Sequence, residues 1–331
     1  MPALGDMMSR LNPWHQKGKV SLKDKTLPPP ITIWTASTLL VCYALIYFLP
    51  FYASPTTRPS PTLARDAVSV IRTRIRFVTA STLLCSVVTY VILARTAGAG
   101  PFDVLHMMGL WPLALADSAR ALFLTALLFA GPLFSYFVVD AGWRTWLRFE
   151  PVRKVLNEWI PWRNVVAGPV TEEMLYRSAS VPLMLIAQAP VKQTIFLSPV
   201  IFGLSHVHHF YEFRLTSPQV PWLPAVLRSA FQLAYTTLFG AYATFIFIRT
   251  GSLLAVCAVH AFCNCMGLPQ LWGRVQPSSS SSSSSKAALL WTVSYYVLLV
   301  AGAVAWYRNL WTLTETEGVL VPESAFSPPK I

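Results

Sequence analysis

Charged residues are scarce in this chain of 331 residues, since Asp, Glu, Lys and Arg together make up 12% of it. That is about half of the roughly 25% that is usual in soluble domains. Hydrophobic residues account for 54%, and the mean hydropathy is +0.49. The composition therefore excludes an ordinary soluble domain, a disordered chain and a collagen-like chain. It favours a protein with several transmembrane helices.

Acidic residues and cysteines are few as well. The chain has 14 Asp and Glu against 26 Lys and Arg, a net charge of +12. In a membrane protein, loops beside anionic headgroups explain such an excess, and we expect no nucleic-acid partner. Five cysteines are too few for a disulfide scaffold. Cys263 and Cys265 lie two residues apart, on different helix faces, which does not suit a zinc site.

Several known signals are missing. We expect no cleavable signal peptide, because the first apolar run begins only at residue 31 and is too long for one. The chain has no C-terminal Cys-a-a-X box, so we do not expect it to be prenylated itself. It has no His-Glu-x-x-His helix, a zinc-protease signature. It also has no internal hydropathy repeat of the kind found in many transporters.

What the chain does have is apolar runs near the 20 or so residues that a helix needs to cross the bilayer. They predict an all-α, multi-pass fold of about eight transmembrane helices. Polar residues interrupt the fourth, fifth and seventh runs. The expected spans cover residues 31–53, 77–94, 121–139, 165–187, 194–210, 227–248, 252–268 and 287–310.

The chain divides into a basic tail (1–30), a membrane domain (31–310) and a polar tail (311–331). An unbroken serine run lies in the segment 277–286, which we expect to be a flexible loop. Basic residues are dense both in the first tail and in the first loop. These two clusters lie on opposite sides of an eight-span protein, so the positive-inside rule does not set the orientation.

Two adjacent carboxylates lie in the fourth expected span, where a charge is costly unless it faces a partner or a wet cavity. Glu173 and Arg177 lie four residues apart, the spacing and order that favour an ion pair on a helix. Glu172 is rotated by about 100° from Glu173. We therefore expect a supporting pair and one carboxylate free for chemistry. The alternative is that both carboxylates serve capping and salt bridging.

Histidines supply the other polar groups inside the expected spans. His206 follows Phe202 by one helical turn and is well placed to face inward, although a satisfied core histidine is the alternative. His208 and His209 approach the membrane surface, where solvation explains them more simply. His260 and Asn264 share one face of the seventh expected span, and helix–helix hydrogen bonding is the alternative for these two.

Together these groups are the parts of a hydrolytic site. Glu172 with His206 supplies a base that deprotonates water. The pair on the seventh expected span, His260 and Asn264, supplies hydrogen-bond donors for the oxyanion of a tetrahedral intermediate. No serine or cysteine has a recognisable nucleophile signature, so direct attack by water is the simpler chemistry. We predict a site without a metal ion or another cofactor, because the His-Glu-x-x-His helix of zinc proteases is missing. The predicted oxyanion donors are His260 and Asn264.

The same residues carry a resemblance to a known family. Their order and spacing resemble the three motifs of the type II CAAX prenyl endopeptidases, the Ras-converting enzymes of the CPBP intramembrane proteases. The resemblance covers a catalytic core of about residues 122–267. The three motifs read Glu172-Glu173-x-x-x-Arg177, Phe202-x-x-x-His206 and His260-x-x-x-Asn264.

The resemblance implies eight helices around a wet cavity that opens toward the cytosol, in the endoplasmic reticulum membrane. Family members remove the last three residues of farnesylated or geranylgeranylated CAAX proteins, Ras-like GTPases among them, so such proteins and the lipid bilayer are the implied partners. Matched by position, the residues take three roles: water activation by Glu172 and His206, oxyanion binding by His260 and Asn264, and support by Glu173 and Arg177.

Two other interpretations stay open. In the first, Glu172, His206 and His260 are zinc ligands of a membrane metalloprotease. In the second, the buried polar groups bind ions or partners in a transporter or a non-catalytic membrane protein. The sequence makes no prediction of the oligomeric state.

Overall fold

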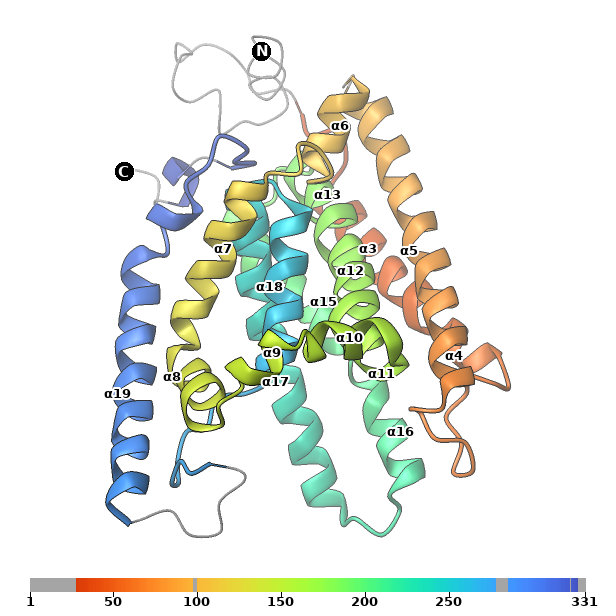
Figure 1. The fold of residues 1–331 in the computed structure, drawn as a ribbon. Coiled ribbons are helices and arrows are strands. Elements are labelled where there is room, and N and C mark those ends of the chain that lie inside the picture. Colours follow the sequence, from red (N-terminus) through yellow and green to blue (C-terminus); the bar gives the residue numbers. More distant parts are fainter. Residues whose placement is uncertain (1–27, 98–99, 278–284, 322, 327–331) are drawn as a thin grey trace.

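A computed structural model describes residues 28–97, 100–277, 285–321 and 323–326 of the chain (Figure 1). Regular secondary structure in these residues is helical throughout, which confirms the all-α prediction. Most of the expected basic tail (1–30) and of the expected serine-rich loop (277–286) lies outside the described residues.

In the described part of the chain, four helical rods are long and apolar enough to cross a membrane, which confirms the predicted class of multi-pass membrane protein. Each is close to or longer than the 20 residues, about 30 Å, that span a bilayer core. The first rod is two helices in series. The rods are α3 (Ile33–Phe48) with α4 (Pro50–Ala53), α5 (Val68–Ala97), α17 (Trp222–Thr250) and α19 (Ser285–Asn309).

Local sequence sets several of the helix ends. Thr32 begins α3, where its hydroxyl accepts the Thr35 N–H at 3.1 Å, and Ser252 caps α18 (Leu253–Met266) in the same way. Gly251 ends α17 with φ at +58°, a conformation that suits glycine. A Cβ at this position would also lie 2.0 Å from the Gly318 carbonyl oxygen.

The third expected span (121–139) is helical but not straight. It consists of α7 (Leu115–Leu128), α8 (Ala130–Phe134) and the π-helix η1 (Ser135–Val139), with a bend of 84° between α7 and the rest. The bend lies at Phe129, just before Pro132. A proline lacks the N–H of a helical hydrogen bond and clashes with the preceding turn, which explains the break.

The fourth expected span (165–187) is also helical, with π-helical segments on either side of the two carboxylates. The Gly168 N–H bonds to the Arg163 carbonyl five residues earlier, and Pro169 brings no N–H of its own. π-Helical turns are rare and frequently mark functional sites. The segments are η2 (Arg163–Ala167), α12 (Gly168–Glu173), η3 (Met174–Ala179) and α13 (Val181–Ile186).

The fifth expected span (194–210) is broken into three short helices, and α18, which covers the seventh (252–268), has 14 residues. The described residues thus contain four candidate spans by length and composition, or five if the bent pair is one span. The count of eight stays a prediction. The short helices of the fifth span are α14 (Val191–Phe196), α15 (Ser198–Ser205) and α16 (His208–Thr216).

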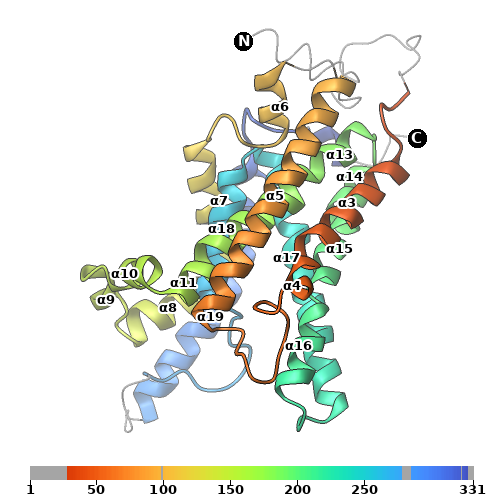
Figure 2. The same ribbon diagram turned by 90° about the vertical axis from the view of Figure 1, so that its right-hand side faces the viewer.

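A set of short helices runs across the long ones in Figure 1 and projects to one side in Figure 2. This set exposes Trp143, Leu147 and Leu156 and also carries several Arg and Lys residues. Aromatic and aliphatic side chains mixed with basic ones are typical of helices in the membrane interface. The set consists of α9 (Trp143–Leu147), α10 (Glu150–Asn157) and α11 (Trp159–Trp162), whereas α6 (Pro101–Met107) lies at the top of the bundle in Figure 1.

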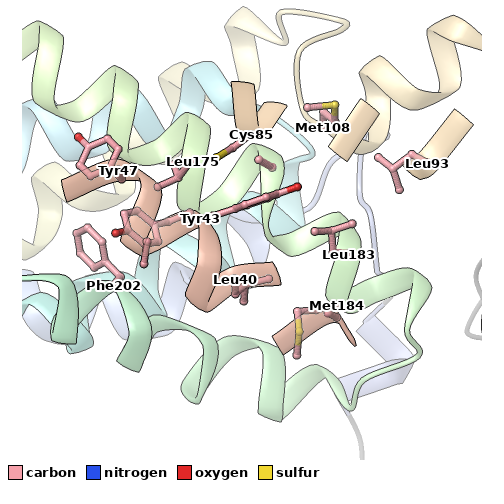
Figure 3. Packing of buried hydrophobic residues seen from close by; sticks show 14 of the residues in the cluster. Leu40, Tyr43, Tyr47, Cys85, Leu93, Met108, Leu175, Leu183, Met184 and Phe202 are labelled. Atoms are coloured by element: carbon pink, nitrogen blue, oxygen red, sulfur yellow. The ribbon is translucent and has the colours of Figure 1, made fainter. Parts of the chain in front are cut away.

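The largest core cluster packs α3 and α5 against η3, α13 and α15 (Figure 3). Hydrogen bonds inside it join the same helices. The Tyr43 and Thr89 hydroxyls lie 2.9 Å apart, and Thr89 donates to the Ala179 carbonyl at 2.9 Å. Tyr47 and Thr171 form a second pair at 2.9 Å. Because Thr171 immediately precedes Glu172, this core holds the carboxylate-bearing turn in place.

The expected polar tail (311–331) packs against α17 where it is described. It contains η4 (Thr312–Thr314) and η5 (Glu323–Phe326). Leu320 is buried with Val321, and its N–H bonds to the Ile248 carbonyl at 2.9 Å. This part of the tail is therefore an element of the packed fold.

Candidate active site

The structure contains a buried ion pair between Glu173 and Arg177. Their side chains are 0% and 1% exposed, and the Arg177 Nη1 lies 3.0 Å from the Glu173 carboxylate. The Arg177 Nη2 donates to the Gly240 carbonyl at 3.2 Å. The guanidinium also lies over the Phe202 ring, 4.7 Å from its centroid. Arg177 thus joins η3 to both α15 and α17.

Gly240 gives the guanidinium its space. A Cβ at this position would lie 3.2 Å from the Arg177 Nη2 and 2.8 Å from the Pro199 Cβ. We expect Gly240→Ala to lower the free energy of unfolding by about 1–3 kcal/mol. The measurement is the melting temperature of the purified protein, which should fall. Without this crowding, the same change in a helix interior stabilises by up to about 1 kcal/mol. A raised melting temperature would therefore contradict the close packing.

His260 on α18 lies between the two carboxylates. Its Nδ1 is 2.6 Å from the Glu173 Oε1, and its Nε2 is 3.9 Å from the Glu172 Oε2. A carboxylate that is paired with Arg177 only accepts hydrogen bonds, so the His260 Nδ1 carries the hydrogen. Glu173 therefore orients the imidazole and turns its Nε2 toward Glu172, an arrangement that the sequence did not indicate.

Asn264 follows His260 by one turn of α18. Its side-chain amide donates to the Asn164 carbonyl on η2 at 2.8 Å. This bond fixes which end of the carboxamide is nitrogen and leaves its second N–H available. Asn164 lies 100 residues away, and its sequence carries no sign of this contact.

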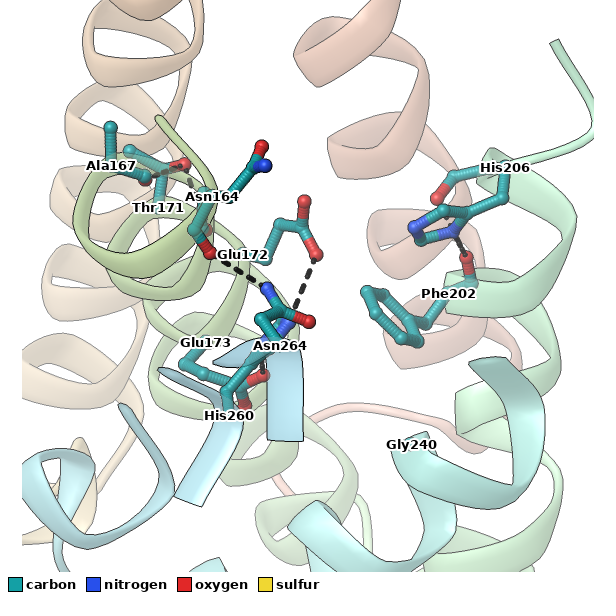
Figure 4. A network of polar contacts seen from close by, with 12 residues as sticks. Asn164, Ala167, Thr171, Glu172, Glu173, Phe202, His206, Gly240, His260 and Asn264 are labelled. Carbon is teal, nitrogen blue, oxygen red and sulfur yellow. Dashed lines mark hydrogen bonds and ion pairs between the residues drawn. The ribbon is translucent and has the colours of Figure 1, made fainter. Parts of the chain in front are cut away.

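His206 follows the last residue of α15 and faces the Glu172 carboxylate across an open space (Figure 4). Its Nδ1 lies 2.8 Å from the Phe202 carbonyl oxygen. Because a carbonyl only accepts, the Nδ1 carries the hydrogen and a neutral ring keeps its Nε2 free as a base. In Figure 4 the Glu172 carboxylate lies between the imidazoles of His206 and His260.

The four residues expected to be catalytic line one cavity of about 690 Å³. This volume is within the range of small-molecule sites, about 300–1,000 Å³. Glu173 and Arg177 are not part of its wall, and they lie behind it. The structure thus brings α12, α15 and α18 together at one cavity, which is lined by Glu172, His206, His260 and Asn264.

His208 and His209 are half-buried and contact other side chains, whereas the sequence suggested that they are solvated. The His208 ring stacks on Phe48 with centroids 5.4 Å apart and an interplanar angle of 1°, and the His209 Nδ1 lies 3.2 Å from the Glu212 carboxylate. Both line the cavity. They are held in place because α15 ends at Ser205 and α16 packs its first turn back against α3 and α4.

The donor side chains of the described residues show whether a metal ion would find ligands. Within the described residues, no three His, Cys, Asp or Glu side chains are placed to hold a metal ion together. Glu172, His206 and His260, the ligands of the zinc interpretation, therefore do not form such a group here.

Comparison with known proteins agrees with the motifs. Residues 155–266, which include all seven motif residues, match the family model described as "Type II CAAX prenyl endopeptidase Rce1-like". The chain is 33% identical over 273 residues to a probable CAAX prenyl protease 2 from Schizosaccharomyces pombe, a match that covers 82% of this chain and 91% of that protein.

Two further relatives are both called CAAX prenyl protease 2. The one from Arabidopsis thaliana is 33% identical over 263 residues, which is 73% of this chain and 82% of the relative. The one from Homo sapiens is 30% identical over 253 residues, which is 73% of this chain and 74% of the relative. No solved structure matches the chain.

Proposed function

Because this chain belongs to the type II CAAX prenyl endopeptidase family, we propose that it releases the C-terminal tripeptide of prenylated CAAX proteins. Ras-like GTPases with a farnesylated or geranylgeranylated cysteine are the proposed substrates. The observation that carries the proposal is the convergence of Glu172, His206, His260 and Asn264 on one cavity.

The reaction begins with a water held between Glu172 and His206. As the water oxygen attacks the carbonyl carbon of the prenylated cysteine, this pair takes up the water proton. Both groups line the same cavity, and the Phe202 carbonyl holds the His206 Nδ1, which leaves its Nε2 free to accept a proton.

The carbonyl oxygen becomes an oxyanion, which needs donors that are already in place. Asn264 offers its second N–H, because the first is bound to the Asn164 carbonyl. His260 offers its Nε2–H while its Nδ1–H is held by Glu173. Donation from both nitrogens requires the imidazolium, whose charge Glu172 balances, because the Glu173 charge is paired with Arg177. The carbon–nitrogen bond then breaks, and the released amine takes the proton from the pair.

The bilayer accounts for the choice of a prenylated substrate. An isoprenoid gains about 0.8 kcal/mol per buried methylene, so it stays in the lipid while the peptide enters the polar cavity. We place the protein in the endoplasmic reticulum membrane, with the cavity open to the cytosol, where prenylated proteins are found.

The test is mass analysis of a farnesylated CAAX peptide after incubation with the purified protein in detergent. We expect loss of the intact tripeptide, and no cleavage of the same peptide without its farnesyl group. Stepwise loss of single residues, or no loss at all, would overturn the proposed activity.

Treatment with chelators distinguishes this mechanism from that of a zinc protease. Because water activation is assigned to Glu172 and His206, we expect unchanged turnover after prolonged incubation with EDTA or 1,10-phenanthroline. The measurement is tripeptide release before and after chelation, with zinc content determined on the same sample. Activity that disappears with the chelator and returns with zinc would establish the metalloprotease instead.

A further inference from the structure

Three arginines line the cavity that holds the proposed catalytic residues: Arg65, Arg74 and Arg163. They come from the segment between α4 and α5, from α5 and from η2. The cleavage reaction as described uses none of them. Their ion pairs decide what each contributes to the charge of the cavity.

Two of the three arginines have acidic partners. The Arg74 Nη2 lies 2.8 Å from the Glu212 carboxylate, and the Arg163 Nη1 lies 2.7 Å from the Asp66 carboxylate. Burial alone would raise the pKa of Glu212, but hydrogen bonds from His209 and Arg74 outweigh it and lower the pKa to about 2. Glu212 is therefore a permanent anion that neutralises Arg74.

Arg65 is different. Within the described residues it has no ion pair or hydrogen bond, although it lines the cavity. It lies close enough to His206 and His209 for its charge to act on both imidazoles. The two ion pairs of its neighbours, Arg74 with Glu212 and Arg163 with Asp66, also lie near Arg65. Among the described residues, Arg65 is thus the one cavity-lining arginine without a carboxylate partner, and it lies near the proposed water-activating pair.

We propose that Arg65 binds the C-terminal carboxylate of the substrate. This inference rests on the proposed function, because a CAAX peptide that enters the cavity brings a carboxylate three residues beyond the scissile bond. An extended tripeptide spans about 10 Å. Guanidinium and carboxylate form charge-assisted, often bidentate hydrogen bonds. By holding the C-terminal carboxylate, such a contact places the peptide bond three residues from the chain end beside the catalytic residues. It therefore selects release of a tripeptide.

The test compares two farnesylated peptides that differ only at the C-terminus, one a free acid and one an amide. We expect the wild-type protein to cleave the acid with a kcat/KM roughly 10- to 100-fold higher, the size of a charge-assisted hydrogen bond. Arg65→Gln lowers cleavage of the acid by the same factor and leaves cleavage of the amide unchanged. Arg65→Lys keeps the charge and part of the preference.

The control is Arg76→Gln, which removes an exposed cation of α5 that does not line the cavity. It should leave both rates unchanged. Equal wild-type cleavage of acid and amide would overturn the role of Arg65 and leave the proposed function intact. If Arg65→Gln lowered the cleavage of both peptides equally, the role of Arg65 would be overturned too. A structural contact or a contact with a lipid headgroup does not depend on whether the peptide ends in an acid or an amide. Failure to cleave either peptide would overturn the proposed function itself.

Discussion

Glu172→Gln is expected to lower the kcat for tripeptide release by about 10²- to 10⁴-fold, the usual contribution of a general base. Glutamine has nearly the same shape but does not take up the proton of the attacking water. Glu172 is 23% exposed, toward the cavity, and its contact with the His260 Nε2 is 3.9 Å long. The substitution therefore removes chemistry and little packing.

The measurement is turnover of the farnesylated peptide together with thermal unfolding in detergent. We expect the melting temperature of Glu172→Gln to equal that of the wild type within a degree or two. Glu158→Gln, which alters an exposed glutamate just before α11, is the matched control and should keep full activity. Normal turnover in Glu172→Gln would remove this carboxylate from the mechanism.

Glu173→Gln is expected to damage both stability and turnover. The Glu173 side chain is fully buried and contacts Arg177 and His260 at 3.0 and 2.6 Å. Its neutralisation strands a buried guanidinium, at a cost of about 3–5 kcal/mol, so the melting temperature should fall by on the order of 10 °C. Turnover should fall in the molecules that remain folded, because His260 loses the group that orients it.

Arg177→Met and the double variant Glu173→Gln/Arg177→Met complete a cycle. Each single variant leaves one buried charge, whereas the double variant leaves none. We expect the double variant to lose clearly less stability than the sum of the single losses. Wild-type melting temperature and turnover in both single variants would contradict a structural role for the pair.

Features that depend on a single stretch of sequence could be predicted from the spacing of residues within that stretch. Long apolar runs predicted the helices that include α3, α5, α17 and α19, and the interval of four residues predicted the geometry found for Glu173 and Arg177. The bend in the third expected span has a local cause in Pro132. The mean hydropathy of a window of about 20 residues is little changed by a single proline, so the run was predicted as one transmembrane helix.

Contacts between distant segments were not predictable in the same way. The 2.6 Å contact between Glu173 and His260 joins residues 87 positions apart, and its existence depends on how α12 and α18 pack. The same holds for Asn264 and Asn164. His208 and His209 were expected in solvent because they approach the end of their span, whereas the His208 ring packs against Phe48 of α3.

The central claim is that Glu172 and His206, from different helices, act on one water. A double-mutant cycle with Glu172→Gln and His206→Gln tests it most directly, with kcat for the farnesylated peptide as the readout. Residues that act as one unit give non-additive losses. We predict that the double variant is about as slow as Glu172→Gln alone. Losses that multiply, with the double variant slower by the product of both single factors, would contradict a shared water.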